Sequence, residues 1–290
     1  MTIQLGILLA LLSALTTNLG FLLKHRGACA APDVNLRHPL RSGADLFRSK
    51  WFAIGMLVAA GAFVVHVAAL TLAPLSLVQT VLAGGLVFLT VLADRFFGCR
   101  LGPRQWAGVG LTAAGLAMIA ITLPAQTGAN AGYSVAGMVA FETGLLAVGG
   151  FLVFSPSFGK HHPHHGTLLG VAAGILFGVS DVAIKALTGI VATEGIFGLV
   201  SPWMFTCVLA SVLAFFASAR GLQQGEAVPV ITATSAAANV SAIGGGILVF
   251  GDPMPGDALG IVVQCVAFVL VILAAALTPA PVRAAGVATA

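Results

Sequence analysis

Three charged residues lie deep inside the apolar stretches of this chain, and their types and spacing are its first indication of chemistry. Asp181 and Lys185 are four positions apart in GVSDVAIKALTG (178–189), so on a helix their side chains share one face. Glu142 lies alone in AGMVAFETGLLAVGG (136–150), with no basic residue nearby in the sequence. A charge in a membrane span costs about 3 kcal/mol on insertion scales, so we treat all three as candidate site residues.

Two interpretations of the Asp–Lys pair stay open. Gly170, Gly174 and Gly178 precede the pair at the same spacing, which places all five residues on one helical stripe. Glycines allow a neighbouring helix to approach closely, so this stripe is expected to face protein. There the pair is either a structural salt bridge or part of a cavity wall. Glu142 in turn needs water, a proton or a partner from another helix, such as Lys185.

Neutral polar side chains supply further candidates. A lone histidine such as His66 is more often a packing residue than a ligand. Thr232, Ser235 and Asn239 share one helical face, which either lines a cavity or makes hydrogen bonds between helices. The candidate substrate and coupling residues are Glu142, Asp181, Lys185, His66, Thr232, Ser235, Asn239 and Gln79.

Motifs of soluble enzymes are missing from the sequence. It has no phosphate-binding glycine loop, nucleophile elbow or paired zinc-histidine motif. The spacing of its four cysteines suggests neither a disulfide framework nor a metal site. We interpret the histidine-rich segment GKHHPHHG (159–166) as a solvated basic loop, with regulation by a bound metal as the less favoured alternative. We therefore expect no enzymatic activity, no cofactor, no resident metal and no nucleic-acid partner.

The composition defines the elements that must position these residues. The chain has 290 residues, 59% of them hydrophobic and 8% charged, with a mean hydropathy of +1.06. Soluble domains have about 25% charged residues, so we predict an all-α polytopic membrane protein. Nine segments are long and apolar enough to span a bilayer, namely 3–23, 51–72, 74–93, 103–123, 134–154, 167–190, 202–220, 226–249 and 256–277.

Lysine and arginine set the orientation, because they concentrate in cytoplasmic loops. With nine spans, all lysine and arginine residues of the connecting loops fall on the same side of the membrane. They are most concentrated in the loop 24–50. The opposite loops contain only acidic charges. We therefore predict that the N-terminus lies outside and the C-terminus inside, in the cytoplasmic membrane. Lys185 is the single lysine or arginine that this one-sided pattern leaves over, and it lies deep within a span.

The segments also indicate an internal repeat. When position 74 is laid against position 226, Thr80, Pro103 and Gly108 each match an identical residue at one constant offset. Helices 1–4 and 6–9 then form two units of opposite orientation, as in many secondary transporters. The predicted organisation is a first repeat (1–123) with a cytoplasmic loop (24–50), a linking helix (134–154), a second repeat (167–277) and a disordered tail (278–290).

Several stretches resemble known families. FFGCRLGPRQWAGVGLTAAGLAMI (96–119) resembles the end of each half in drug/metabolite transporters of the EamA type. FLLKHRGA (21–28) and AALTLAPLSLVQTVLAGG (68–85) resemble more closely the nine-span NIPA-like branch, whose known members move magnesium. That branch usually has a Gly-Glu pair in its second helix, whereas Ala62 stands in place of the glutamate here.

These observations favour a secondary transporter of a small solute or metabolite that works by alternating access. Proton coupling through Glu142 or Asp181 stays open. The expected partners are a small-molecule substrate and the lipid bilayer, and a homodimer is also compatible with the sequence. The alternatives are a NIPA-like magnesium permease and a membrane scaffold or accessory subunit without transport activity.

Overall fold

Long apolar helices make up the part of the chain that the structure, a computed structural model, describes. That part comprises residues 2–32, 34, 39–85, 132–154, 165–225, 227–252 and 254–277, with isolated positions between 103 and 122. The elements are α1 (Thr2–Ala28), α2 (Pro39–Phe47), α3 (Lys50–Leu72), α6 (Val135–Phe154), α7 (His165–Glu194), the 3-10 helix η2 (Gly195–Leu199), α8 (Pro202–Gln224), α9 (Ala227–Leu248) and α10 (Ala258–Leu277). A shorter helix, Leu75–Gly85, follows α3. The predicted all-α class is confirmed over these residues.

Five helical segments are long and apolar enough to cross a membrane. They are Ile3–Ala28, Lys50–Leu72, Val135–Phe154, His165–Leu199 and Pro202–Gln224, and they fall on five of the predicted spans. A helix of about 20 residues extends about 30 Å, the thickness of the hydrocarbon core. α9 and α10 lie on the last two predicted spans. Most of segment 103–123 and the tail lie outside the described residues, so the nine-span count, the orientation and the inverted repeat stay predictions.

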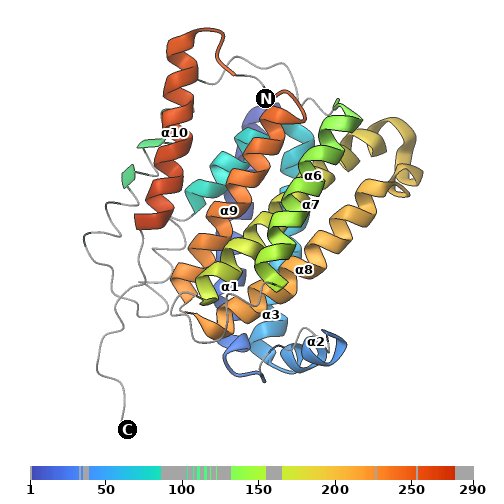
Figure 1. Ribbon diagram of the computed structural model, residues 1–290, viewed down its shortest axis with the longest axis vertical. Coiled ribbons are helices and arrows are strands. Elements are labelled where there is room, and N and C mark those ends of the chain that lie inside the picture. The colour runs from blue at the N-terminus through green and yellow to red at the C-terminus, as the bar shows by residue number, and fades with distance from the viewer. Residues whose placement is uncertain are drawn as a thin grey trace.

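α7 runs through the middle of the bundle. In Figure 1, α1, α3, α6, α8 and α9 run alongside it, while α10 stands apart at the edge. Residues 172–174 and 178–180 of α7 are all buried, which a central position requires. Because α7 packs against helices from both predicted repeats, its side chains reach both halves of the molecule.

The glycine stripe of α7 faces protein, as the sequence predicts. A methyl group added at Gly170 would lie 2.8 Å from the carbonyl oxygen of Val230, and one added at Gly178 would lie 3.1 Å from that of Ala238. At Gly174 it would clash with the backbone of Thr234. The absence of side chains therefore brings the α9 backbone into direct contact with α7. This close crossing fixes the polar face of α9 beside Asp181.

The segment 24–50, predicted as the connection between the first two spans, contains helical structure that the sequence analysis did not identify. α1 continues to Ala28, and α2 then forms a separate short helix that begins at Pro39. Proline suits the first position of a helix because its fixed φ angle is helical and it lacks only an N–H that would stay unpaired. Nine residues are too few to span a bilayer, so a search for spans could not detect this element.

Candidate functional site

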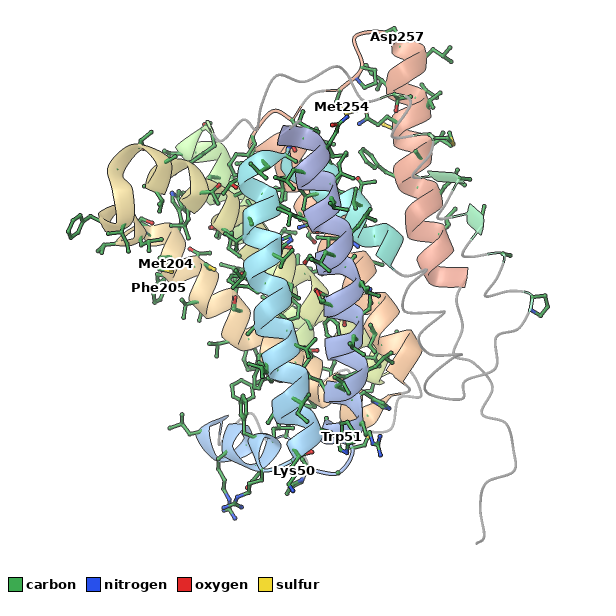
Figure 2. The ribbon with its side chains drawn as sticks, turned by 180° about the vertical axis from the view of Figure 1, so that it is seen from behind. Lys50, Trp51, Met204, Phe205, Met254 and Asp257 are labelled. Carbon is green, nitrogen blue, oxygen red and sulfur yellow. The ribbon has the colours of Figure 1, made fainter. Side chains whose placement is uncertain are left out.

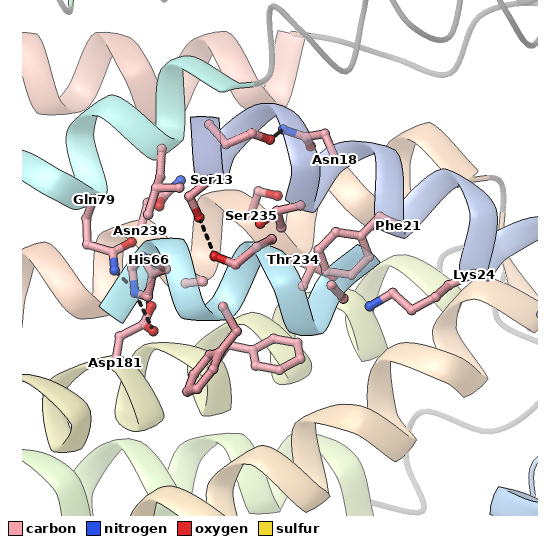
Figure 3. Close-up of a pocket in the computed structure, with 18 residues that line it drawn as sticks. Ser13, Asn18, Phe21, Lys24, His66, Gln79, Asp181, Thr234, Ser235 and Asn239 are labelled. Atoms are coloured by element: carbon pink, nitrogen blue, oxygen red, sulfur yellow. Dashed lines mark hydrogen bonds and ion pairs between the residues drawn. The ribbon is translucent and has the colours of Figure 1, made fainter. Parts of the chain in front are cut away.

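A cavity of about 210 Å³ opens between the helices of the two predicted repeats (Figure 3). α1, α3 and the helix Leu75–Gly85 contribute one side of its wall, and α7 and α9 contribute the other. The polar residues of the wall are Ser13, Thr17, Asn18, Lys24, His66, Gln79, Asp181, Thr234, Ser235 and Asn239. The cavity therefore brings together five of the predicted site residues, namely His66, Gln79, Asp181, Ser235 and Asn239.

Asp181 is the acidic group of this wall, and two side chains hold it. The Nε2 amide of Gln79 donates to its Oδ2 atom at 2.8 Å, and the Nε2 of His66 donates to its Oδ1 atom at 3.1 Å. The three residues come from three helices and converge at one end of the cavity, opposite Lys24 (Figure 3). Asp181 keeps part of its surface exposed. Its carboxylate is thus oriented by neutral or weakly basic donors and still faces the cavity.

Lys185 does not pair with Asp181, so the structural salt bridge, one of the two interpretations left open by the sequence, is not formed. Its ammonium group instead donates to the carbonyl oxygens of Leu70 at 2.8 Å and Ala73 at 3.1 Å. Those carbonyls lie at the C-terminal end of α3, where the last carbonyl groups of a helix have no N–H donor within the helix. The lysine side chain is fully buried, with 0% exposure, and does not line the cavity. No ion pair joins it to Asp181 or Glu142 among the described residues.

A second buried carboxylate, Asp252, lies beside this lysine. It follows α9, and its Oδ2 atom accepts the backbone N–H of Ser76 at 2.7 Å. It also acts electrostatically on the Lys185 ammonium. We call Lys185, Asp252 and the backbone 70–76 the junction cluster. The cluster joins two residues of the second predicted repeat to the break between α3 and the helix Leu75–Gly85, and the sequence analysis missed it.

Glu142 lies outside the cavity. Its side chain is 3% exposed, and its Oε1 atom has no hydrogen-bond partner among the described residues. Thr206 and Cys207 of α8 are the polar side chains that interact electrostatically with its carboxyl group. Glu142 is thus a proton-binding candidate rather than a contact for substrate in the cavity.

The structure describes the side chains of two of the three neutral polar candidates on α9. Ser235 and Asn239 line the cavity, as predicted, whereas the side chain of Thr232 lies outside the described residues. The α1 residues Ser13, Thr17 and Lys24 were missed as site residues. Their spacing of four and eleven positions puts them on one face of a helix, and that pattern is a signal that a search for charges alone overlooks.

Asn18 supplies an oxygen that the fold leaves unpaired. Its Nδ2 atom donates to the carbonyl oxygens of Ala14 at 2.8 Å and Gly85 at 2.9 Å, which fixes the amide. Its Oδ1 atom is buried without a partner among the described residues, although the residue lines the cavity. A carbonyl-type oxygen held in this way is suited to a hydrogen-bond donor or to a hydrated cation.

The cavity combines one carboxylate with several amide and hydroxyl oxygens. At the far end of the cavity the Lys24 ammonium group makes a cation–π contact, with its Nζ atom 4.0 Å from the centre of the Phe21 ring. The remaining wall is apolar and contains Ala59, Ala62, Phe63 and Phe177. Such a site can hold a small cation or a small polar solute, and it contains no arrangement of groups typical of covalent catalysis.

Comparisons with known proteins agree with a membrane transporter rather than an enzyme. The chain is 26% identical over 289 residues to the "Probable magnesium transporter NIPA9" of Arabidopsis thaliana, an alignment that covers 92% of this chain and 80% of the relative. No protein-family model and no solved structure matches the chain.

A second relative shows the family. The chain is 30% identical over 253 residues to an uncharacterized protein of Corynebacterium glutamicum, covering 86% of this chain and 85% of the relative. The chain therefore belongs to the same family as that bacterial protein. Its multi-pass membrane character is supported by both the apolar helices and the similarity to a transporter.

Proposed function

We propose that the protein is a NIPA-like transporter that carries a hydrated divalent cation, with magnesium as the physiological ion, through the cavity beside Asp181. The observation that carries this proposal is the direction of the Lys185 side chain. Next to Asp181, a lysine would repel a cation, but its ammonium group is bound to the carbonyl oxygens of Leu70 and Ala73 instead. Among the described residues, Asp181 therefore has no lysine or arginine partner and is held by Gln79 and His66. The similarity to NIPA9 supports the same ion.

The chemistry of the wall suits a magnesium ion that keeps its water. Mg²⁺ prefers oxygen ligands, loses water reluctantly and is often held by one or two carboxylates. At about 30 Å³ per water molecule, a cavity of about 210 Å³ has room for about seven waters, enough for an ion with its first hydration shell. In this proposal Asp181 attracts the ion, and Asn18, Ser235 and Asn239 accept or donate hydrogen bonds to its waters.

The proposed transport cycle is alternating access around this cavity. Helices of both predicted repeats form the wall, so a rotation of one repeat against the other would expose Asp181 first to one side and then to the other. A scaffold without transport activity would be expected to pack solidly around Asp181, and the cavity argues against that alternative.

The direct test uses cells and vesicles. Expression should restore growth of a magnesium-uptake-deficient bacterial strain at limiting magnesium, and the purified protein in liposomes should admit Mg²⁺ to an entrapped magnesium-sensitive dye. Empty liposomes and liposomes with heat-unfolded protein are the controls. Absence of both growth rescue and Mg²⁺ entry would refute the proposed ion.

Ala62 gives a sharper prediction about affinity. It lies on the cavity wall one helical turn before His66, which contacts Asp181, and it occupies the position where the NIPA-like branch usually has glutamate. The substitution Ala62→Glu adds a second carboxylate and should lower the half-saturating magnesium concentration about tenfold, since affinity rises with ligand charge. Ala62→Gln is the matched control, because it adds nearly the same volume without charge. Equal effects of the two variants would show that the cavity does not bind a cation.

A second candidate function, proton-coupled transport of a small solute, is favoured by Glu142. A carboxyl group that is buried, partly unpaired and outside the cavity can bind a proton without competing for substrate. We expect Glu142→Gln to remove the effect of an imposed pH gradient on uptake into vesicles while exchange at equal pH continues. Unchanged pH-gradient dependence in this variant would exclude Glu142 as the coupling site. An untargeted metabolite comparison of deletion and overexpressing cells would identify a solute other than magnesium.

A further inference from the structure

The helix α2 has an orientation unlike that of the spans. Figure 1 and Figure 2 show it at one end of the bundle, lying across the direction of α1 and α3. Lys50 and Trp51 mark the same end, directly after α2 in the chain. A helix that lies across the spans at their end is placed where the hydrocarbon of a bilayer gives way to its headgroups.

One face of α2 holds it against the bundle. Leu46 is 0% exposed and Ser42 is buried. The ring of Phe47 lies 5.6 Å from that of Phe52 and 6.5 Å from that of Phe215. These contacts with α3 and α8 fix the rotation of α2 about its own axis, so its outward face is defined.

The outward face is apolar. Leu40, Ala44 and Phe47 follow one another at spacings of four and three residues and therefore form one stripe. Leu40 is 90% exposed, and half of Phe47 and much of Trp51 are exposed as well. An apolar stripe on a short helix beside an exposed tryptophan is typical of helices that lie in the membrane interface.

Basic side chains flank this stripe. Arg41 and Lys50 are exposed, and Arg48 is 82% exposed although its guanidinium contacts Asp45 at 3.0 Å. Arg26 lies with its guanidinium 4.2 Å from the centre of the Trp51 ring. The segment 24–51 contains six Lys or Arg residues against two acidic residues. This excess is complementary to the phosphate groups of acidic lipids, which concentrate in the cytoplasmic leaflet.

We propose that α2 is an interfacial helix that binds acidic phospholipids, with Arg41 and Arg48 contacting lipid phosphates while Leu40 inserts between acyl chains beside the exposed half of Phe47. The exposed apolar stripe alone fits any bilayer, and the flanking arginines select for anionic headgroups. The same arginines disfavour a second copy of this chain as the occupant, because two such faces would bring like charges together. This binding site does not depend on the identity of the transported substrate.

The site has a direct connection to the cavity. α2 lies between α1 and α3 in the chain, and both of those helices line the cavity, through Lys24 and through His66 among others. Lipid bound to α2 therefore acts on the ends of two helices whose separation shapes the cavity wall. We expect activity to rise with the fraction of acidic lipid in the membrane.

The test measures lipid binding to the full-length protein. Native mass spectrometry after detergent exchange would give the affinities for phosphatidylglycerol and phosphatidylcholine of matched chain length. The wild type should prefer phosphatidylglycerol, and the double variant Arg41→Gln/Arg48→Gln should lose about tenfold in affinity for it. Lys160→Gln, a basic residue on the same expected side but outside α2, should change neither affinity.

Several outcomes would overturn this assignment. Equal binding of the two lipids by the wild type, or the same loss in Lys160→Gln as in the arginine variant, would refute a specific site on α2. Leu40→Ser should weaken binding of both lipids, and unchanged binding would show that the apolar stripe does not insert. A protein dimer that persists at low concentration and disperses in Leu40→Ser would instead identify a second copy as the occupant. Hydrogen exchange of the α2 amides should be as slow in each variant as in the wild type if α2 is still folded against the bundle.

Discussion

Asp181→Asn is expected to reduce magnesium entry into proteoliposomes by at least about 100-fold at limiting magnesium. Asparagine keeps the size of the side chain and its ability to accept a hydrogen bond from Gln79, but it removes the negative charge. Changes even in the outer shell of metal sites commonly cost 10- to 100-fold in affinity, and this change removes the carboxylate itself. The measurement is the initial rate of dye response across a magnesium titration.

The control for this variant is Asp257→Asn. Asp257 is an exposed carboxylate that caps the first turn of α10 through the Gly260 N–H, and asparagine caps helices equally well. We expect wild-type uptake from it. If Asp181→Asn transports magnesium like the control while remaining folded, the cation site lies elsewhere. If it loses magnesium entry at limiting but not at saturating magnesium, Asp181 contributes to binding rather than to the transport step.

The span positions were predictable because the bilayer leaves few alternatives. An apolar run of about 20 residues must form a helix, since unpaired backbone groups are too costly in hydrocarbon. The close approach of α9 was likewise predictable from Gly170, Gly174 and Gly178, since glycines at four-residue spacing permit only a near neighbour. α2 was not predictable in this way, because its stability depends on contacts with Phe52 and Phe215, which are distant from its own sequence pattern.

The site shows where local spacing fails. Four-residue spacing places Asp181 and Lys185 on one face of α7, but a lysine side chain is long and flexible and moves to the strongest acceptors within its reach. Those acceptors are the carbonyl oxygens at the end of α3, and no local pattern in α7 identifies them. His66 and Gln79 were identified by residue type alone. Their common partner, Asp181, follows only from the arrangement of three helices.

Lys185→Met is expected to cause the largest loss of stability of any single change considered for this protein. Methionine has nearly the same length as lysine but leaves the carbonyls of Leu70 and Ala73 without their donor and Asp252 without its buried cation. Leaving a buried hydrogen-bonding group without its partner typically costs about 1–3 kcal/mol, and this change leaves two carbonyl oxygens without their charged donor. For a chain of this size that corresponds to a fall in melting temperature of about 10 °C, measured by thermal unfolding in detergent.

The partner residue provides a test that a general packing defect would fail. In the double variant Lys185→Met/Asp252→Asn the buried negative charge is also removed, while asparagine still accepts the Ser76 N–H. If Lys185 and Asp252 stabilise each other within the junction cluster, this variant should recover part of the stability that Lys185→Met loses. Lys50→Met, which replaces an exposed lysine, should leave the melting temperature unchanged. Additive losses in the double variant would show that Lys185 and Asp252 act independently, and the carbonyl contacts alone would then account for the burial of this lysine.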